Sequence, residues 1–461
     1  MSIEKVDLLI GGKQHLPASG QYYPLYSPVD GSLFAEVADA NEADVDAAVS
    51  AAKSAFYNEW KFCDREKKRN LLNQFLQKLR ASEDELSAVK VLPGPGGTGG
   101  LATDVVNYYI AQLDHLTGTI MEHSDQGTHY IIREPLGVVA VFSPWNGPVL
   151  GSLLSIIPAL VAGNTVVLKT PEEEAPQATK AMEAFHEAGF PAGVVNVISG
   201  SGPEAGKALV AHPDVRVIGF TGSTSTGKKI MASAADQLKR VQLNLGNKTP
   251  QIVFPDASLS QAAQAAANSA FPGQACSAIS RILVHKSIKD EYITLLQEAA
   301  EKNGPCLLIN NAAIERMEEY VALGKKDGKL LFGGSLPDGD EFAQGCYFTP
   351  TAIEFSDQSS AVCQDEIFGP ILSVLEFDSD EEALTLANAT DYGLIASIWT
   401  QDTQRQRYFT QRLEMGTIAI NRGGGLSTRS PWGGFKQSGI GRRYGEQGLE
   451  PFLEYKTVWA P

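Results

Sequence analysis

Short apolar runs alternate with helical patterns between residues 138 and 238, and this order limits the fold more than any other feature of the chain. The run Val-Val-Ala-Val-Phe at 138–142 has no polar position, which is typical of a strand buried on both faces of a sheet. Strands joined by helices pair in parallel, so the region predicts an α/β domain with a doubly wound parallel sheet of the dinucleotide-binding type. The predicted strands lie at 138–142, 165–168, 194–198 and 215–220, and the predicted helices at 175–188, 203–211 and 226–238.

The same alternation restarts after residue 245 and predicts a second α/β domain. Two further segments, 127–133 and 453–458, have extended patterns and belong to neither domain. Exposed strands often pair across subunits, so we expect a β-strand oligomerisation arm and a homodimer or homotetramer. The predicted limits are 1–116 with 137–245 for the dinucleotide-binding domain, 246–436 for the second domain, and 117–136 with 437–461 for the arm.

Charge and cysteine usage argue against several classes of partner. The net charge of −16 argues against nucleic acid and anionic membrane surfaces. The longest apolar stretch, 149–161, is interrupted by Gly151 and Pro158, and no secretory signal is visible, so we expect neither a membrane span nor export. Five scattered cysteines without paired spacing favour a reducing, cytoplasmic location. The seven histidines show no ligand spacing, so no metal site is predicted.

Loops at the carboxyl ends of the first-domain strands carry the residue types that bind a dinucleotide. Lys169 and Glu172 follow the strand at 165–168 and could meet a ribose, although a solvated charge pair is the simpler interpretation of this loop alone. Gly-bearing turns at 200–206 and 219–223 open helices, where free backbone amides favour an anion. Three such loops in succession favour a dinucleotide site.

Cys276 and Asn146 are the candidates for chemistry. Cys276 lies in the segment Phe-Pro-Gly-Gln-Ala-Cys-Ser at 271–277 and could be a nucleophile, or a small buried hydrophobe as free cysteines usually are. Asn146, in the loop after the first strand, could donate to an oxyanion together with a backbone N–H near Cys276, or could cap the turn before Pro148. The heptapeptide alone favours the structural role for the cysteine.

Six motifs in sequence order resemble the aldehyde dehydrogenase superfamily over nearly the whole chain. They are Phe-Ser-Pro-Trp-Asn (142–146), Leu-Lys-Thr-Pro-Glu (168–172), Phe-Thr-Gly-Ser-Thr (220–224), Gly-Gln-Ala-Cys (273–276), Glu-Ile-Phe-Gly-Pro (366–370) and Gly-Gly-Phe-Lys-Gln-Ser-Gly-Ile-Gly (433–441). The resemblance implies that Cys276 is the nucleophile and that the second domain is catalytic. It also implies a thiohemiacetal with a small-molecule aldehyde, hydride transfer to a nicotinamide, and hydrolysis of the resulting thioester to a carboxylate.

The resemblance further implies roles for residues around the cysteine. Asn146 and the Cys276 amide would hold the oxyanion. Lys169 and Glu172 would bind the adenosine ribose, and Glu172 would repel a 2′-phosphate, which favours NAD over NADP. Glu366 would bind the nicotinamide ribose. The cofactor-binding residues implied in this way are Phe142, Ser143, Trp145, Lys169, Glu172, Gly202, Gly206, Phe220, Gly222, Ser223, Leu245, Glu366 and Phe368.

Two acidic positions of the family are replaced in this chain. The family's Glu-Leu-Gly-Gly-Lys motif is Asn-Leu-Gly-Asn-Lys at 244–248, so Asn244 stands at the position of the usual general base. A second acidic position, after Gly-Arg near the carboxyl terminus, is Arg443. An amide cannot accept a proton from the thiol or from the deacylating water, and the loss of a general base typically slows a reaction by roughly 10²–10⁴-fold.

Three functions remain open on these residues. The one we prefer is a slow or specialised NAD-dependent dehydrogenase that releases a carboxylate. The second is a coenzyme A-acylating dehydrogenase, since family members that pass the acyl group to a thiol can dispense with the glutamate. The third is a deacylation-impaired variant or a noncatalytic NAD-binding protein.

Small residues mark the expected substrate pocket. Gly147, Gly151 and Leu154 stand where the family often has bulkier side chains, and the loop at 423–425 is three glycines. Trp432 is the aromatic candidate for the far wall. The pattern favours a bulky aldehyde, aromatic or long-chain, with backbone packing as the alternative role of the glycines.

Overall fold

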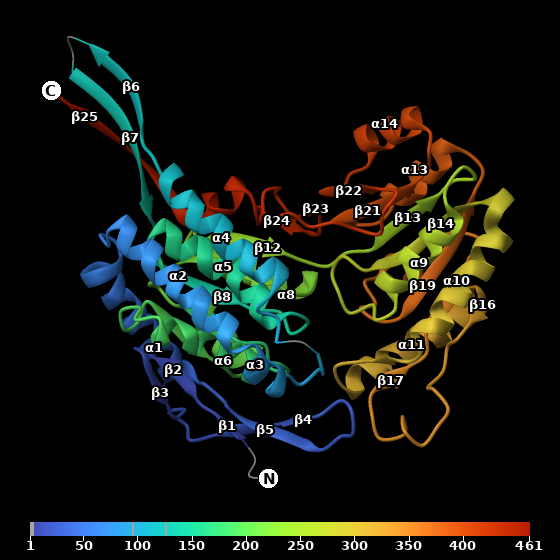
Figure 1. Ribbon diagram of the computed structural model, residues 1–461, viewed down its shortest axis with the longest axis horizontal. Helices are drawn as coiled ribbons and strands as arrows, with labels where there is room; N and C mark the ends of the chain where they lie inside the picture. The colour runs from blue at the N-terminus through green and yellow to red at the C-terminus, as the bar shows by residue number, and fades with distance from the viewer. Residues whose placement is uncertain (1–3, 95, 125–126) are drawn as a thin grey trace.

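The computed structural model describes residues 4–94, 96–124 and 127–461, which form two lobes and a protruding arm (Figure 1). The first lobe is built on an eight-stranded sheet in the order β24-β12-β11-β8-β9-β10-β2-β3. The strands from β12 to β10 run parallel, while β24 and β2 add antiparallel strands at the two sides. The strands are β2 (Leu8–Ile10), β3 (Lys13–His15), β8 (Val138–Phe142), β9 (Thr165–Lys169), β10 (Val195–Ile198), β11 (Val215–Thr221), β12 (Arg240–Asn244) and β24 (Gly439–Ile440).

Helices cover both faces of this sheet, which confirms the doubly wound fold. In β8, Val139 and Val141 lie in one core and Val138 and Phe142 in the other, because successive strand residues point to opposite faces. The first core includes α2 (Arg65–Ala81), α3 (Glu83–Ala88), α4 (Gly100–Gln112), α5 (Pro148–Ala162) and α6 (Ala175–Glu187), and the second includes α1 (Glu42–Ala55), α7 (Lys207–Ala211) and α8 (Thr224–Ala235).

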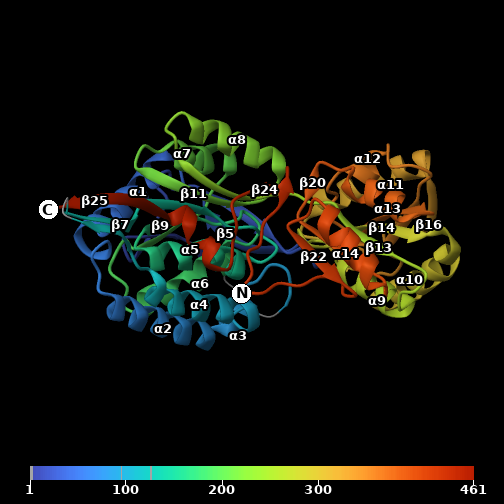
Figure 2. The same cartoon turned by 90° about the horizontal axis from the view of Figure 1, so that it is seen from above.

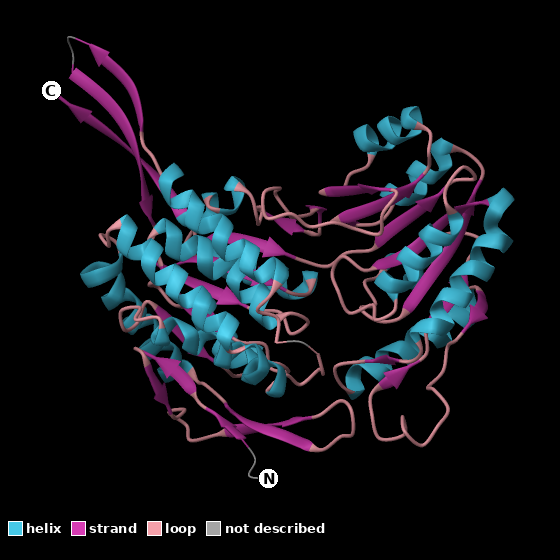
Figure 3. Ribbon diagram, in the orientation of Figure 1, coloured by secondary structure: helices cyan, strands magenta, loops and turns pink. Residues whose placement is uncertain are grey.

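The second lobe has a seven-stranded sheet in the order β16-β18-β19-β14-β13-β21-β22, also between helices (Figure 3). Its strands are parallel except for β16, which pairs antiparallel with β18. The strands are β13 (Thr249–Val253), β14 (Ile279–His285), β16 (Lys329–Phe332), β18 (Thr351–Glu354), β19 (Ile371–Phe377), β21 (Ile395–Trp399) and β22 (Thr417–Ile420). One core includes α9 (Leu259–Ala270) and α10 (Lys289–Asn303), and the other includes α11 (Asn311–Asp327), α12 (Ala361–Gln364), α13 (Asp380–Asn388) and α14 (Thr403–Arg412).

Shorter strands complete the described structure. They are β1 (Glu4–Val6), β4 (Tyr22–Tyr26) and β5 (Leu33–Ala38) in an amino-terminal sheet, and the pairs β15 (Cys306–Leu307) with β17 (Tyr347–Phe348) and β20 (Tyr392–Gly393) with β23 (Phe435–Lys436). Within the described ranges, no helix combines the length and the apolar character that crossing a bilayer requires.

The arm is a three-stranded antiparallel sheet that projects from the first lobe near the carboxyl terminus (Figure 1). Its middle strand is β7 (Gly127–Pro135), which lies between β6 (Thr119–Ser124) and β25 (Leu453–Ala460). Leu453 is opposite Pro135 in the register of β25 and β7. The two extended segments singled out in the sequence are therefore neighbouring strands.

The carboxyl-terminal limit predicted for the arm differs from the observed pairing. The prediction assigns 437–461 to the arm, but Gly439 and Ile440 pair with β12 and extend the first sheet. The reason is that β12 would otherwise leave a row of unpaired backbone groups at the edge of the sheet. The arm strand itself begins at Leu453.

The chain crosses between the lobes at residues 245–248, from β12 to β13, and returns through the segment between β22 and β24 (Figure 2). The end of β12, with Asn244, therefore lies at the junction of the two sheets. The carboxyl ends of parallel strands in both lobes are where α/β proteins place their ligands.

Candidate active site

The cysteine loop, residues 271–278, connects α9 to β14 in the second lobe and carries Cys276. Gly273 in this loop has a φ of +66°, in the left-handed region that favours glycine. A Cβ at this position would lie 2.4 Å from the carbonyl oxygen of Gly369, so the loop can pass this close only with glycine. The contact fixes the cysteine loop against the loop that carries Glu366.

Two polar side chains tie the cysteine loop to its surroundings. Gln274 donates to the carbonyl oxygen of Leu307 at 2.9 Å and accepts from the N–H of Ile309 at 3.0 Å. Asn146 reaches across from the first lobe, and its Nδ2 donates to the Gln274 carbonyl oxygen at 2.8 Å. Asn146, the predicted oxyanion donor, therefore contacts the cysteine loop. Its Nδ2 is hydrogen-bonded to the carbonyl oxygen of Gln274, two residues before Cys276.

The Cys276 thiol is partly buried and packs against the core of the first lobe. Burial, followed by the nearby charge of Glu366, raises the pKa of the Cys276 thiol to about 11. The positive charge of Arg443 and a hydrogen bond from Asn244 act in the opposite direction. The thiol is therefore protonated at neutral pH in the free protein, and it needs help to become a nucleophile.

Asn244 ends β12 and is buried beside the thiol. Its Oδ1 has no hydrogen-bond partner among the residues that the structure describes. The amide can donate to the sulfur, but it has no basic atom that could take the thiol proton. The structure thus places Asn244, at the position where the family has glutamate, beside the Cys276 thiol.

Glu366 is the carboxylate that acts on the thiol from the second lobe. Its side chain and Cys276 line one small cavity, together with Asn247 and Phe368. Oε1 of Glu366 accepts from the backbone N–H of Asn247 at 2.9 Å. Burial raises the pKa of Glu366 to about 7, so its charge changes close to neutral pH.

Asn247 is a site residue that sequence reasoning missed. Its Nδ2 donates to the Cys276 carbonyl oxygen at 3.1 Å and to Thr249 Oγ1 at 2.6 Å. Its Oδ1 accepts from the N–H of Leu394 at 3.3 Å. The available signal was the second departure in the 244–248 motif, where the family has glycine and this chain has asparagine.

Lys169 and Glu172 lie together at the carboxyl end of β9. Lys169 is buried, and its Nζ is 3.4 Å from Glu172 Oε1. The same carboxylate oxygen accepts from the N–H of Gly202, in the loop after β10, at 2.8 Å. An acceptor and a cation held side by side at two neighbouring strand ends fit the ribose of a dinucleotide.

The other predicted cofactor residues gather at the same edge of the sheet. Trp145 and Phe368 approach edge to face from the two lobes, with ring centroids 5.5 Å apart. Phe368 has a φ of +60°, which is uncommon for a bulky residue and indicates that its surroundings hold it in place. Ser223 caps the amino terminus of α8, where free amides favour an anion. The remaining positions are buried strand ends or their packing partners: Phe142, Ser143, Gly206, Phe220, Gly222 and Leu245.

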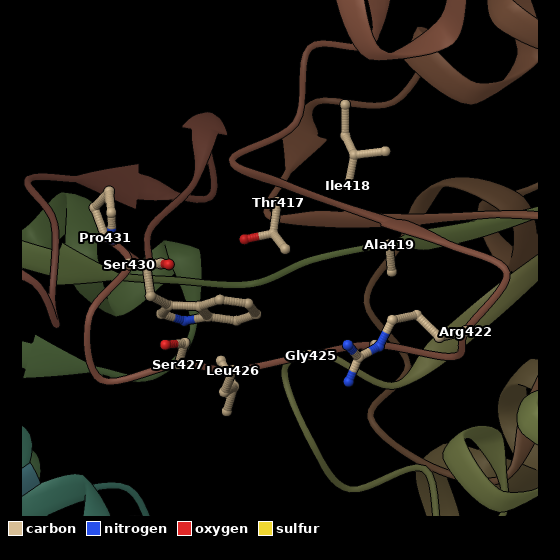
Figure 4. Close-up of a pocket in the computed structure, with 11 residues that line it drawn as sticks. Thr417, Ile418, Ala419, Arg422, Gly425, Leu426, Ser427, Ser430 and Pro431 are labelled. Carbon is tan, nitrogen blue, oxygen red and sulfur yellow. The ribbon is translucent and has the colours of Figure 1, made fainter. Parts of the chain in front are cut away.

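A hollow lined from the second lobe and the returning segment lies beside the cysteine loop. One cavity of about 360 Å³ is lined by Ser277, Trp432 and the glycines at 423–425, among others. A second cavity, of about 240 Å³, extends past Arg422 and Thr417 (Figure 4). Trp432 and the three glycines therefore line the space next to the cysteine loop.

The three predicted pocket residues of α5 and its cap have different surroundings. A Cβ at Gly147 would meet no atom within 4 Å, so this position faces open space. Leu154 is buried in the core against which Cys276 packs. Gly151 packs closely against Pro144, since a Cβ there would lie 2.5 Å from the proline ring. Gly151 therefore serves backbone packing, which was the alternative considered for it.

The comparisons with known proteins agree with this geometry. A model of the aldehyde dehydrogenase family matches residues 15–458, and the chain belongs to the aldehyde dehydrogenase family. The NADP/NAD-dependent aldehyde dehydrogenase PuuC of Escherichia coli is 35% identical over 474 residues, covering 98% of this chain and 95% of PuuC.

Among the described residues, no group of three or more histidine, cysteine, aspartate or glutamate side chains could hold a metal ion.

Two solved structures illustrate the likeness. The P. syringae AldA indole-3-acetaldehyde dehydrogenase, solved with NAD+ and IAA, has a TM-score of 0.95 at 35% identity, with 100% of this chain and 97% of that chain covered. The gamma-glutamyl-gamma-aminobutyraldehyde dehydrogenase of Burkholderia cenocepacia has a TM-score of 0.94 at 38% identity, with 99% and 97% covered.

Proposed function

We propose that this protein oxidises an aldehyde to a carboxylate through a thioester on Cys276, with NAD as the hydride acceptor. The observation that carries the proposal is the grouping of Cys276, Asn244 and Glu366 at the junction of the lobes. Asn146 contacts the same loop from the first lobe. Family membership supports this reaction class, because the family is one of aldehyde dehydrogenases.

The chain's own groups carry the covalent steps. The Cys276 thiol releases its proton, and the thiolate attacks the carbonyl carbon to form a C–S bond and an alkoxide. The Cys276 N–H and the Asn146 amide donate to that oxygen, once Asn146 exchanges the Gln274 carbonyl for it. Loss of hydride from the same carbon leaves a thioester, and addition of water then releases the carboxylate and the thiol.

NAD, when bound, supplies the acceptor for the hydride. Lys169 and Glu172 would hold its adenosine ribose, and Glu366 its nicotinamide ribose. Glu172 opposes a 2′-phosphate by like charge, so NAD is preferred over NADP. The relatives support both cofactors, since AldA was solved with NAD+ and PuuC is named NADP/NAD-dependent.

The substrate that fits is a bulky aldehyde, aromatic or long-chain. The cavity of about 360 Å³ beside Ser277 is walled by glycines and the Trp432 indole, which give space and an aromatic face. A relative that acts on indole-3-acetaldehyde, by its name, has the same fold. We expect a higher kcat/KM for an aryl aldehyde than for acetaldehyde, and equal values would contradict this assignment.

Coenzyme A is the alternative acyl acceptor, because Asn244 cannot activate water. The test follows NADH formation by purified protein with NAD and a panel of aldehydes, with and without coenzyme A. Water as acceptor predicts slow turnover that coenzyme A leaves unchanged. Turnover that depends on coenzyme A would establish the alternative. NAD binding without any NADH from any aldehyde would indicate a noncatalytic protein.

We also propose that the arm joins copies of this chain into a homodimer or homotetramer. Ile120, Met121 and Trp459 are exposed large apolar side chains on the arm. Its outer strands, β6 and β25, each pair with β7 on one side within the described chain. Sedimentation velocity should show smaller particles for Ile120→Glu than for the unaltered protein, whereas Phe62→Glu, at an exposed site outside the arm, should not change the particle size.

A further inference from the structure

Arg443 is a buried cation that the fold holds near the nucleophile. The residue is 2% exposed. Its backbone exchanges two hydrogen bonds of 2.7 Å with Trp432, one in each direction. Nη2 of the guanidinium donates to the carbonyl oxygen of Phe220, at the end of β11, at 3.3 Å. These contacts fix both the backbone and the charged end of the side chain.

The charge of Arg443 lacks the partner that a buried guanidinium normally has. No carboxylate forms an ion pair with it among residues 4–94, 96–124 and 127–461. Its Nε has no hydrogen-bond partner within the same residues. The titratable groups that interact with it are Cys276, Tyr444 and Tyr109. Both tyrosines are neutral near pH 7, because burial raises the pKa of each.

Two groups of opposite charge lie in the surroundings of the thiol. Glu366 lines one cavity with Cys276, and Arg443 pairs through its backbone with Trp432, which lines the cavity beside Ser277. Glu366, from the second lobe, disfavours the Cys276 thiolate, and Arg443, from the segment that follows β24, favours it. The Asn244 amide also lowers the pKa of the thiol, but it carries no charge. An unpaired buried cation interacts strongly with a developing negative charge, because few water molecules screen it.

We propose that Arg443 activates Cys276 by stabilising its thiolate through charge, in place of a general base that would take the proton. The thiol proton passes to solvent, and the resulting sulfur anion balances the guanidinium. The nucleophile would thus be activated by the charge of Arg443, which stands at a position where the family usually has an acidic residue. This inference rests on the proposed function only in taking Cys276 as the nucleophile.

The test measures the rate of Cys276 alkylation by iodoacetamide against pH, in the full-length protein without aldehyde or NAD. Cys276→Ser gives the background from the other cysteines. Arg443→Gln should raise the midpoint pH of the alkylation-rate profile by about one pH unit or more. Near pH 8 this shift corresponds to an alkylation rate about tenfold lower. Arg443→Lys should restore most of the rate. The ultraviolet absorbance of the thiolate, taken as the difference from Cys276→Ser, should titrate with the same midpoints.

Arg442→Gln is the matched control, since it removes the same charge at the adjacent position. Arg442 donates to the carbonyl oxygens of Gly434 and Gly441. The control variant should leave the midpoint unchanged. An unchanged midpoint in Arg443→Gln, or equal shifts in the Gln and Lys variants, would overturn the proposal. If Arg443→Gln fails to fold, Arg443→Met and Arg443→Lys supply the comparison. NADH formation that persists in Cys276→Ser would instead refute the proposed function and leave the thiolate result standing.

Discussion

The buried side-chain amide of Asn244, at the end of β12, lies beside the Cys276 thiol at the junction of the two lobes and lowers the pKa of that thiol. A carboxylate in this position could move a proton, but an amide can only orient the sulfur and polarise it. In the proposed reaction, Asn244 therefore lies beside the Cys276 thiol without being able to perform the proton transfer that a carboxylate would perform there. The predictions below follow from that relationship and from the groups around it.

Asn244→Glu should raise steady-state turnover, because the new carboxylate could accept a proton from water that attacks the thioester. The expected gain is roughly 10²–10⁴-fold in kcat for aldehyde oxidation. Asn244→Gln is the matched control, since it lengthens the side chain without adding a base, and it should give no gain. Equal turnover in the Glu variant and the unaltered protein would show that deacylation does not limit the rate.

Glu172→Gln should shift the cofactor preference toward NADP. The change removes the negative charge that opposes a 2′-phosphate but leaves an oxygen that can accept from Gly202. We expect the ratio of kcat/KM for NADP to that for NAD to rise about tenfold or more. Glu173→Gln, one residue further along, removes the same charge and should change the ratio little. Similar ratios for both variants would place the specificity elsewhere.

Asn247→Ala should destabilise the fold around the cysteine loop. It leaves the Cys276 carbonyl, Thr249 and the Leu394 N–H without the hydrogen bonds that the amide provides. Unsatisfied buried groups of this kind cost about 1–3 kcal/mol, so the free energy of unfolding in urea should fall by that amount. Asn58→Ala, at an exposed position, should lower it by much less.

Lys248→Met should stabilise the protein, and more at low pH than at high pH. Lys248 is fully buried, its Nζ has no hydrogen-bond partner among the described atoms, and burial lowers its pKa to about 7. The folded chain thus prefers the neutral amine. The resulting penalty is absent well above pH 10.5, grows as the pH falls, and is complete below pH 7.

The increase in Tm for Lys248→Met should therefore be larger at pH 6 than at pH 9. Lys229→Met, which removes an exposed ammonium, supplies the comparison and should show no such dependence. A gain independent of pH would mean that packing, and not charge, explains the effect.

The regular parts of the fold were predictable from the sequence because they depend on periodic patterns. The run at 138–142 predicts a strand covered on both faces, and β8 has that environment. The extended segments at 127–133 and 453–458 predict strands, and they pair with each other. The short β24 carries no pattern in its two residues, so its place beside β12 could not be predicted.

The sequence predicts those parts of the site whose role depends on the chemical identity of a residue. It does not predict those parts whose role depends on how the residues pack after folding. Cys276, Asn244 and Glu366 were named from motifs, and the structure brings them together. Gly151 was expected to enlarge the pocket, but its missing Cβ makes room for Pro144. The isolation of Arg443 depends on which groups surround it after folding, and the sequence does not contain that information in a local pattern.

The central claim is that Cys276 forms an acyl thioester in a site where position 244 carries an asparagine amide and not a carboxylate base. Rapid mixing of the protein with NAD and an aryl aldehyde tests it most directly, with the chain mass measured after quenching. The account predicts a fast release of about one NADH per chain, then a slow steady state, and an acyl adduct on Cys276 that is absent from Cys276→Ser. NADH released linearly from the start, with no adduct on the chain, would contradict it.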